Sequence, residues 1–172
     1  MGNDEPRAVL LTGVYGSGKS SVAMEMADVL EERDQGYAML DLDFIDWFAM
    51  PGFGDEPEHR LLLANLASVM NNYRAVGVPR YILARSFREA SEIEDVRTVM
   101  GMPMTIVRLT TPFAEIERRL EPDVTTARKA DLAEAAVWLE AGTGEGLEDV
   151  TIANDRSIRD VALEVLRLTG WA

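Results

Sequence analysis

The chain has 172 residues, of which 47% are hydrophobic and 27% are charged, a length and composition typical of a globular domain with a substantial core. Its formal net charge of −13 argues against non-specific nucleic-acid binding, which requires a basic surface. No apolar run is long enough to cross a membrane, and the absence of cysteine excludes disulfides and thiolate metal sites, as is typical of cytoplasmic proteins.

The first predicted elements are a buried strand over 8–12 and a helix over 20–30, joined by the segment GVYGSGKS at 13–20. This segment matches G-x-x-x-x-G-K-[ST], the Walker A or phosphate-binding motif, in the strand–loop–helix context that the motif requires. Glycines let backbone N–H groups converge on phosphate oxygens, and the N-terminus of the following helix favours the same anion. We therefore expect a nucleoside triphosphate and Mg²⁺ to bind here.

Two residues of this segment have specific expected roles. Lys19 would contact the β- and γ-phosphates, and the hydroxyl of Ser20 would bind Mg²⁺. Lys19 is one of only two lysines in the chain, which makes its accidental occurrence in this position improbable. The nucleotide-binding residues expected here are Gly13, Tyr15, Gly16, Ser17, Gly18, Lys19, Ser20 and Ser21.

The second predicted strand covers 37–43 and ends in the acidic segment DLDFID. Asp41 and Asp43 are two residues apart, so on a strand their side chains would share a face. Asp41 is the candidate to support Mg²⁺ through water, because no acid ends the third predicted strand. Asp43 is the candidate base that orients and deprotonates an acceptor hydroxyl. The alternative is a pair of solvated acids at a strand end.

An aromatic connection over 44–54 and a helix over 58–76 form the expected acceptor side, 44–76. The large apolar residues of this connection would line an acceptor pocket or pack against the helix: Trp47, Phe48, Met50 and Phe53.

A strand over 79–85 and a helix over 89–100 follow. Arg85 ends this strand and Arg88 follows it, where they would hold a polar or anionic acceptor or form a cap or surface pair.

The remaining pattern predicts a strand over 104–109, a helix from 112 that ends before Pro122, a helix over 126–141, a strand over 149–153 and a helix over 157–168. The arginine-flanked polar segment at about 118–130 is similar to a kinase lid, which closes over phosphates and excludes water. Its cations are Arg118, Arg119, Arg128 and Lys129, and their alternative role is in surface ion pairs. Arg119 is the candidate to stabilise the developing charge, and Arg118 to contact the nucleotide.

The segment after the last strand reads Asn154-Asp155-Arg156. Asn154 and Arg156 are candidates for contacts with the nucleotide, close to its base. The segment does not match Asn-Lys-x-Asp, the guanine-specific motif, which favours ATP over GTP.

Strands that alternate with helices predict a three-layer α/β domain over 1–172, with a five-stranded parallel sheet and helices on both faces. Ligands of such sheets bind at the carboxyl ends of the strands. The segments 13–20 and 41–46 and the residues after the third and fourth strands are therefore expected to meet.

The chain length, the loop at 13–20 and the Asp-x-Asp at 41–43 resemble the small P-loop metabolite kinases of the shikimate, gluconate and adenylylsulfate kinase type. Chloramphenicol phosphotransferase is similar in its acid at this strand end, followed by an apolar and acidic stretch and a proline, here Pro51. The resemblance implies the P-loop NTPase fold with a short lid, ATP and Mg²⁺ as cofactors, and the catalytic-base role for Asp43. A triple-glycine loop after the third strand and the long substrate motif of adenylylsulfate kinases are absent, so the acceptor is not named.

The sequence thus predicts an ATP- and Mg²⁺-dependent phosphotransferase that acts on a hydroxyl of a small molecule. A nucleotide-binding regulatory protein or ATPase without an acceptor, and an atypical nucleoside or nucleotide kinase, are the alternatives. Nothing in the sequence indicates the oligomeric state.

Overall fold

A computed structural model describes residues 5–120 and 126–171. Five short apolar segments form one sheet in the order β2-β3-β1-β4-β5, and all four neighbouring pairs are parallel. The predicted five-stranded parallel sheet is confirmed. The strands are β1 (Arg7–Thr12), β2 (Ala38–Asp41), β3 (Arg80–Ala84), β4 (Met104–Thr110) and β5 (Val150–Ala153).

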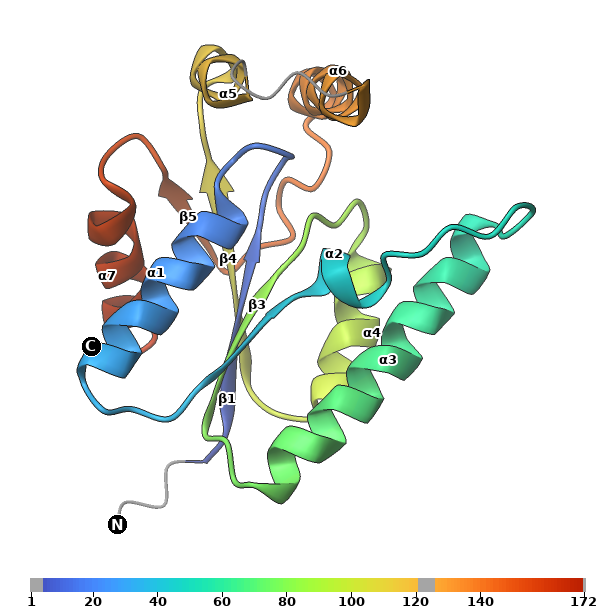
Figure 1. Ribbon diagram of the computed structural model, residues 1–172. Coiled ribbons are helices and arrows are strands. Elements are labelled where there is room, and N and C mark those ends of the chain that lie inside the picture. The colour runs from blue at the N-terminus through green and yellow to red at the C-terminus, as the bar shows by residue number, and fades with distance from the viewer. Residues whose placement is uncertain (1–4, 121–125, 172) are drawn as a thin grey trace.

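Helices cover both faces of this sheet. Figure 1 shows α1 and α7 on one face, α3 and α4 on the other, and α5 and α6 beyond the carboxyl end of β4. The helices are α1 (Lys19–Glu32), α2 (Leu42–Ile45), α3 (Asp55–Ala75), α4 (Ala90–Met100), α5 (Phe113–Leu120), α6 (Thr126–Ala141) and α7 (Ile158–Leu168). Within the described residues, none of these helices is both long enough and apolar enough to span a membrane.

The central strand β1 supplies side chains to both halves of the core. Val9 and Leu11 pack in the cluster that includes α1 and α7, whereas Ala8 and Leu10 pack in the cluster that includes α3 and α4. All four are at most 2% exposed. This burial on both faces explains why the strand is a continuous apolar run instead of an alternating one.

The second strand is shorter than predicted. It ends at Asp41, and the next four residues form the short helix α2. A carboxylate oxygen of Asp41 accepts a hydrogen bond from the backbone N–H of Asp43 at 3.2 Å, so Asp41 caps this helix. The expectation that Asp41 and Asp43 share one face of a strand is therefore wrong.

The helices α5 and α6 pack against the loop that follows β1. Ile116 of α5 and Ala135 of α6 are buried in one small cluster with Val14 of that loop. The predicted lid at 118–130 joins these two helices, but its residues 121–125 and the side chains of Arg128 and Lys129 lie outside what the structure describes. The lid therefore stays a prediction.

Candidate active site

The loop of residues 13–20, called here the glycine loop, has a backbone that requires glycine at two positions. Gly13 and Gly18 have φ angles of +135° and +94°, which side-chain-bearing residues rarely adopt. A β-carbon on Gly13 would lie 2.4 Å from the carbonyl oxygen of Leu109, and one on Gly18 would lie 2.3 Å from Nδ2 of Asn154. The loop thus lies directly against β4 and the end of β5.

Lys19 is the first residue of α1, and its ammonium group folds back over the loop. Its Nζ donates to the carbonyl oxygens of Gly13 and Val14 at 3.2 and 3.1 Å, and the residue is only 7% exposed. Burial lowers the pKa of Lys19 to about 8, although the nearby carboxylates of Asp43 and Asp41 act in the opposite direction. A desolvated cation with only carbonyl acceptors is complementary to a polyphosphate.

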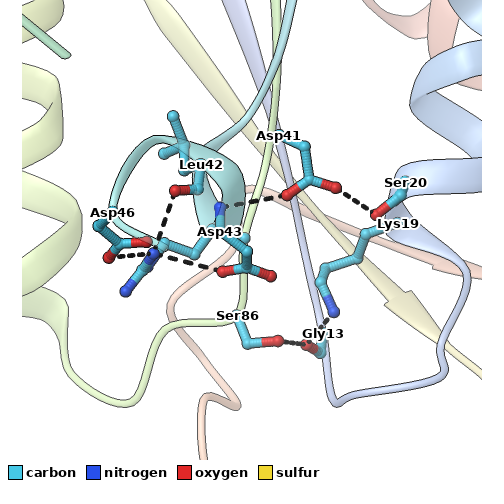
Figure 2. Close-up of polar contacts among 9 residues, drawn as sticks. Gly13, Lys19, Ser20, Asp41, Leu42, Asp43, Asp46 and Ser86 are labelled. Atoms are coloured by element: carbon cyan, nitrogen blue, oxygen red, sulfur yellow. Dashed lines mark hydrogen bonds and ion pairs between the residues drawn. The ribbon is translucent and has the colours of Figure 1, made fainter. Parts of the chain in front are cut away.

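The next residue connects the glycine loop to β2. The hydroxyl of Ser20 donates to a carboxylate oxygen of Asp41 at 2.5 Å, as Figure 2 shows. The oxygen of Ser20 keeps its lone pairs for a hard cation, and Asp41 fixes its orientation. The pairing of β2 with β3 brings Asp41 to the same sheet edge as the glycine loop.

Asp43 lies between Asp41 and a buried ion pair. Arg85, which follows β3, forms an ion pair with Asp46 at 2.8 Å and donates hydrogen bonds to Asp43 at 3.3 Å and to the carbonyl oxygen of Leu42 at 3.4 Å. The side chain of Asp46 is 5% exposed, whereas that of Asp43 is 58% exposed. Partial burial raises the pKa of Asp43 and the cation of Arg85 opposes this shift, while Asp41 reinforces it.

In Figure 2 the side chains of Asp43, Lys19 and Ser86 point toward one another around the start of the glycine loop. Ser86 was not among the predicted site residues. Its hydroxyl donates to the carbonyl oxygen of Gly13 at 2.8 Å. Thr111 was also missed, and its hydroxyl donates to the carbonyl oxygen of Ser17 at 3.2 Å. Both are small polar residues within two positions of the end of a strand, a signal that the sequence contains.

Asn154 and Arg119 support the other side of the loop. Asn154 is fully buried, and its side-chain amide donates to the carbonyl oxygen of Ser17 at 2.8 Å. Arg119 donates to the carbonyl oxygen of Asn154 at 3.0 Å and to Glu115 at 2.8 Å. A guanidinium nitrogen of Arg119 is also 3.5 Å from the position that a β-carbon on Gly18 would occupy. Asn154 therefore holds the loop, and Arg119 lies beside it.

Three other predicted cations have partners of their own. Arg118 is 70% exposed and pairs with Glu115, and Arg156 pairs with Glu164 on α7. Arg88 pairs with Glu134 of α6 at 2.6 Å, and its guanidinium lies 5.2 Å from the ring centroid of Trp138.

Two residues of the loop and of α1 complete the expected set. Tyr15 is half-buried and packs against the small cluster that α5 and α6 form with the loop. Ser21, the third residue of α1, is also half-buried.

A comparison with protein families identifies the family of this chain. The family model described as adenylylsulphate kinase matches residues 5–119, which include β1, the glycine loop, Asp41 and Asp43. The chain belongs to the adenylylsulphate kinase family. A search of curated proteins returned no match.

Solved structures with the same fold cover almost the whole chain. The adenylylsulfate (APS) kinase CysC of Mycobacterium tuberculosis, in complex with AMPPNP and APS, is 26% identical over 96% of this chain and 98% of its own, with a TM-score of 0.65. A sugar kinase from Janibacter sp. HTCC2649 is 20% identical over 97% and 96%, with a TM-score of 0.67. Shikimate kinase from Acinetobacter baumannii, in complex with shikimate, is 18% identical over 96% and 93%, with a TM-score of 0.57. The resemblance to small P-loop metabolite kinases is confirmed.

As a member of this kinase family, the chain uses ATP and Mg²⁺, and the residues present fit both. Lys19 supplies a buried cation, and the N-terminus of the fourteen-residue helix α1 points its N–H groups at the loop. Within the described residues no group of three acidic or histidine side chains is positioned to hold a metal ion.

Proposed function

We propose that this kinase transfers the γ-phosphoryl group of ATP to a hydroxyl of a small molecule, and that Asp43 is the base. The observation that carries the proposal is the position of the Asp43 carboxylate. It is exposed to an incoming acceptor, is held by Arg85, and lies on the same sheet edge as Lys19 and the Ser20–Asp41 pair.

Each residue then has a defined task. Lys19 and the loop amides hold the β- and γ-phosphates, Ser20 binds Mg²⁺ and Asp41 orients Ser20. Asp43 accepts the proton of the acceptor hydroxyl. At the same time the hydroxyl oxygen bonds to the γ-phosphorus, and the bond between that phosphorus and the ADP oxygen breaks. Partial burial raises the pKa of Asp43 from its ordinary value, which makes the carboxylate a better proton acceptor.

The proposal assigns the lid cation to Arg119. Arg119 is the arginine beside the glycine loop, so it is the candidate that reaches the transferred phosphoryl group when the segment 118–130 closes. Such a cation stabilises the charge that develops during transfer. Asn154 acts as a positioning residue for the loop, while Arg118 and Arg156 would contact the nucleotide only after leaving their present carboxylate partners.

The variant Asp43→Asn tests the base. It should bind AMPPNP as the wild type does, yet lose acceptor-dependent ADP release by about 100-fold or more, the usual contribution of a general base. Asp28→Asn, which changes an exposed acid on α1, is the matched control and should retain full activity. Full turnover by Asp43→Asn would remove the base assignment. ADP release that no alcohol stimulates would instead favour a nucleotide-binding ATPase.

A further inference from the structure

The connection after Asp43 exposes an unusual amount of aromatic surface. Phe44, Trp47 and Met50 are 66%, 78% and 61% exposed, and Phe48 and Phe53 are 37% and 42% exposed. We call residues 44–53 the aromatic connection. None of these five side chains belongs to either of the two large core clusters of the described residues.

The aromatic side chains form two pairs, and the second pair lines a hollow. The rings of Phe44 and Trp47 are 5.6 Å apart, and those of Phe48 and Phe53 meet edge to face at 5.0 Å. Phe48, Met50, Phe53 and neighbouring residues line a hollow of about 420 Å³. Ligand sites for small molecules have volumes of roughly 300–1,000 Å³ and are lined mainly by apolar side chains.

The charged groups at the carboxyl edge of the sheet disfavour the binding of an anionic acceptor. Asp41, Asp43 and Asp46 are three carboxylates, and they face two cations, Lys19 and Arg85. Lys19 lies over the glycine loop, where the phosphates of ATP bind. Arg85 is half-buried and is already neutralised by the buried carboxylate of Asp46 and by Asp43. An acceptor that carries a carboxylate or sulfate would therefore meet a surplus of negative charge.

We propose that the acceptor is an uncharged or cationic alcohol with an aromatic or other apolar ring, which lies on the aromatic connection and presents its hydroxyl to Asp43. This inference rests on the proposed kinase function. It separates the chain from the relatives crystallised with APS and with shikimate, because both of those ligands are anions.

A small molecule fits this surface better than a second copy of the chain. Phe44 directly follows Asp43 in the short helix α2, so the aromatic connection begins at the residue next to the candidate base. Stable protein interfaces bury about 800 Å² on each partner and are built from 20–30 residues. The aromatic connection is a single short segment, and the negative charge beside it would face the same charge on a second copy.

Binding can be tested without turnover by a matched pair of fluorescent probes. N-phenylnaphthylamine is neutral, and anilinonaphthalene sulfonate has the same rings with an added anionic group. In the presence of Mg²⁺ and AMPPNP, the neutral probe should bind at least about tenfold more tightly, a ratio that corresponds to about 1.4 kcal/mol. Trp47→Ser and Phe48→Ser should each weaken binding of the neutral probe about tenfold or more. Leu168→Ser, an exposed apolar residue on α7, is the control and should not.

Turnover is then compared for phenyl glucoside and phenyl glucuronide, which differ in the replacement of a hydroxymethyl group by a carboxylate. A higher kcat/KM for the glucoside than for the glucuronide supports the inference. In Trp47→Ser the kcat/KM for the glucoside should fall because KM rises. Equal or better phosphorylation of the glucuronide, or equal binding of the two probes, overturns it. The inference is also overturned if the aromatic variants bind the neutral probe as the wild type does. The same holds if light scattering shows that these variants weaken probe binding only because a dimer dissociates. If no alcohol is phosphorylated while the probe results hold, the kinase proposal fails and the ligand preference stands.

Discussion

Lys19→Met should make the nucleotide-free protein more stable while it abolishes nucleotide binding. Burial lowers the pKa of Lys19 from 10.5 to about 8, so holding this ammonium group charged near neutral pH costs about 3 kcal/mol at 1.36 kcal/mol per pKa unit. Methionine retains most of the apolar stem and removes the charge. The variant also loses two hydrogen bonds to Gly13 and Val14, which offsets part of the gain. We expect a net increase of about 1–3 kcal/mol in the free energy of unfolding.

The pH dependence supplies an internal control. Between pH 8 and 10.5 the unfolded chain keeps the proton of Lys19 and the folded protein has released it, so the free energy of unfolding of the wild type rises with pH across this window. Lys19→Met lacks this rise. The stability difference between variant and wild type should therefore be largest below pH 8 and should shrink by about 3 kcal/mol by pH 10.5.

Urea denaturation of both proteins without nucleotide, from pH 7 to 10.5, measures this difference, because titrations common to both cancel. Saturating AMPPNP with Mg²⁺ should stabilise the wild type and leave Lys19→Met unchanged. A variant that is less stable at pH 7, or a stability difference that is the same at pH 7 and 10.5, would refute the reasoning. Either result would mean that the ammonium group of Lys19 is well solvated or already paired.

Three further predictions concern the same edge of the sheet. Gly13→Ala should cost more than about 2 kcal/mol of stability in urea denaturation, because its β-carbon would overlap the Leu109 carbonyl at a positive φ; a stable variant would mean that the loop shifts readily. Asp46→Asn should lower the free energy of unfolding by about 2 kcal/mol. This is less than the 3–5 kcal/mol typical of breaking a fully buried pair, because Arg85 is a fifth exposed and keeps Asp43 as an ion-pair partner. Equal stability of this variant and the wild type would contradict a buried ion pair. The affinity for AMPPNP, measured by calorimetry, should fall above pH 8 by up to about tenfold per pH unit as Lys19 loses its proton, and a flat profile to pH 9.5 would contradict this.

Local patterns predicted the larger part of the fold. The apolar runs at 8–12 and 104–109 lie within β1 and β4, and the helix predicted over 126–141 has the bounds of α6. These segments satisfy the periodicity and propensity rules without help from distant residues. The prediction failed after Asp41, where the side chain accepts a hydrogen bond from the backbone N–H of Asp43 and starts a helix. Such a side-chain hydrogen bond competes with the hydrogen bonds between strands, and residue spacing does not reveal which of the two forms.

The sequence by itself determined the donor side of this protein. The glycine loop needs only neighbouring residues to define its backbone, so its motif was sufficient to predict a triphosphate site. Only the tertiary structure shows the ion pairs on the proposed acceptor side, because Arg85 meets Asp43 and Asp46 through the pairing of β2 with β3. The same is true of Asn154, which reaches Ser17 through the pairing of β5 with β4 and the contact of the loop with that edge. Charge pairing and exposure are properties of residues far apart in the chain, and they distinguish a cation that is free to bind a substrate from one that is already neutralised.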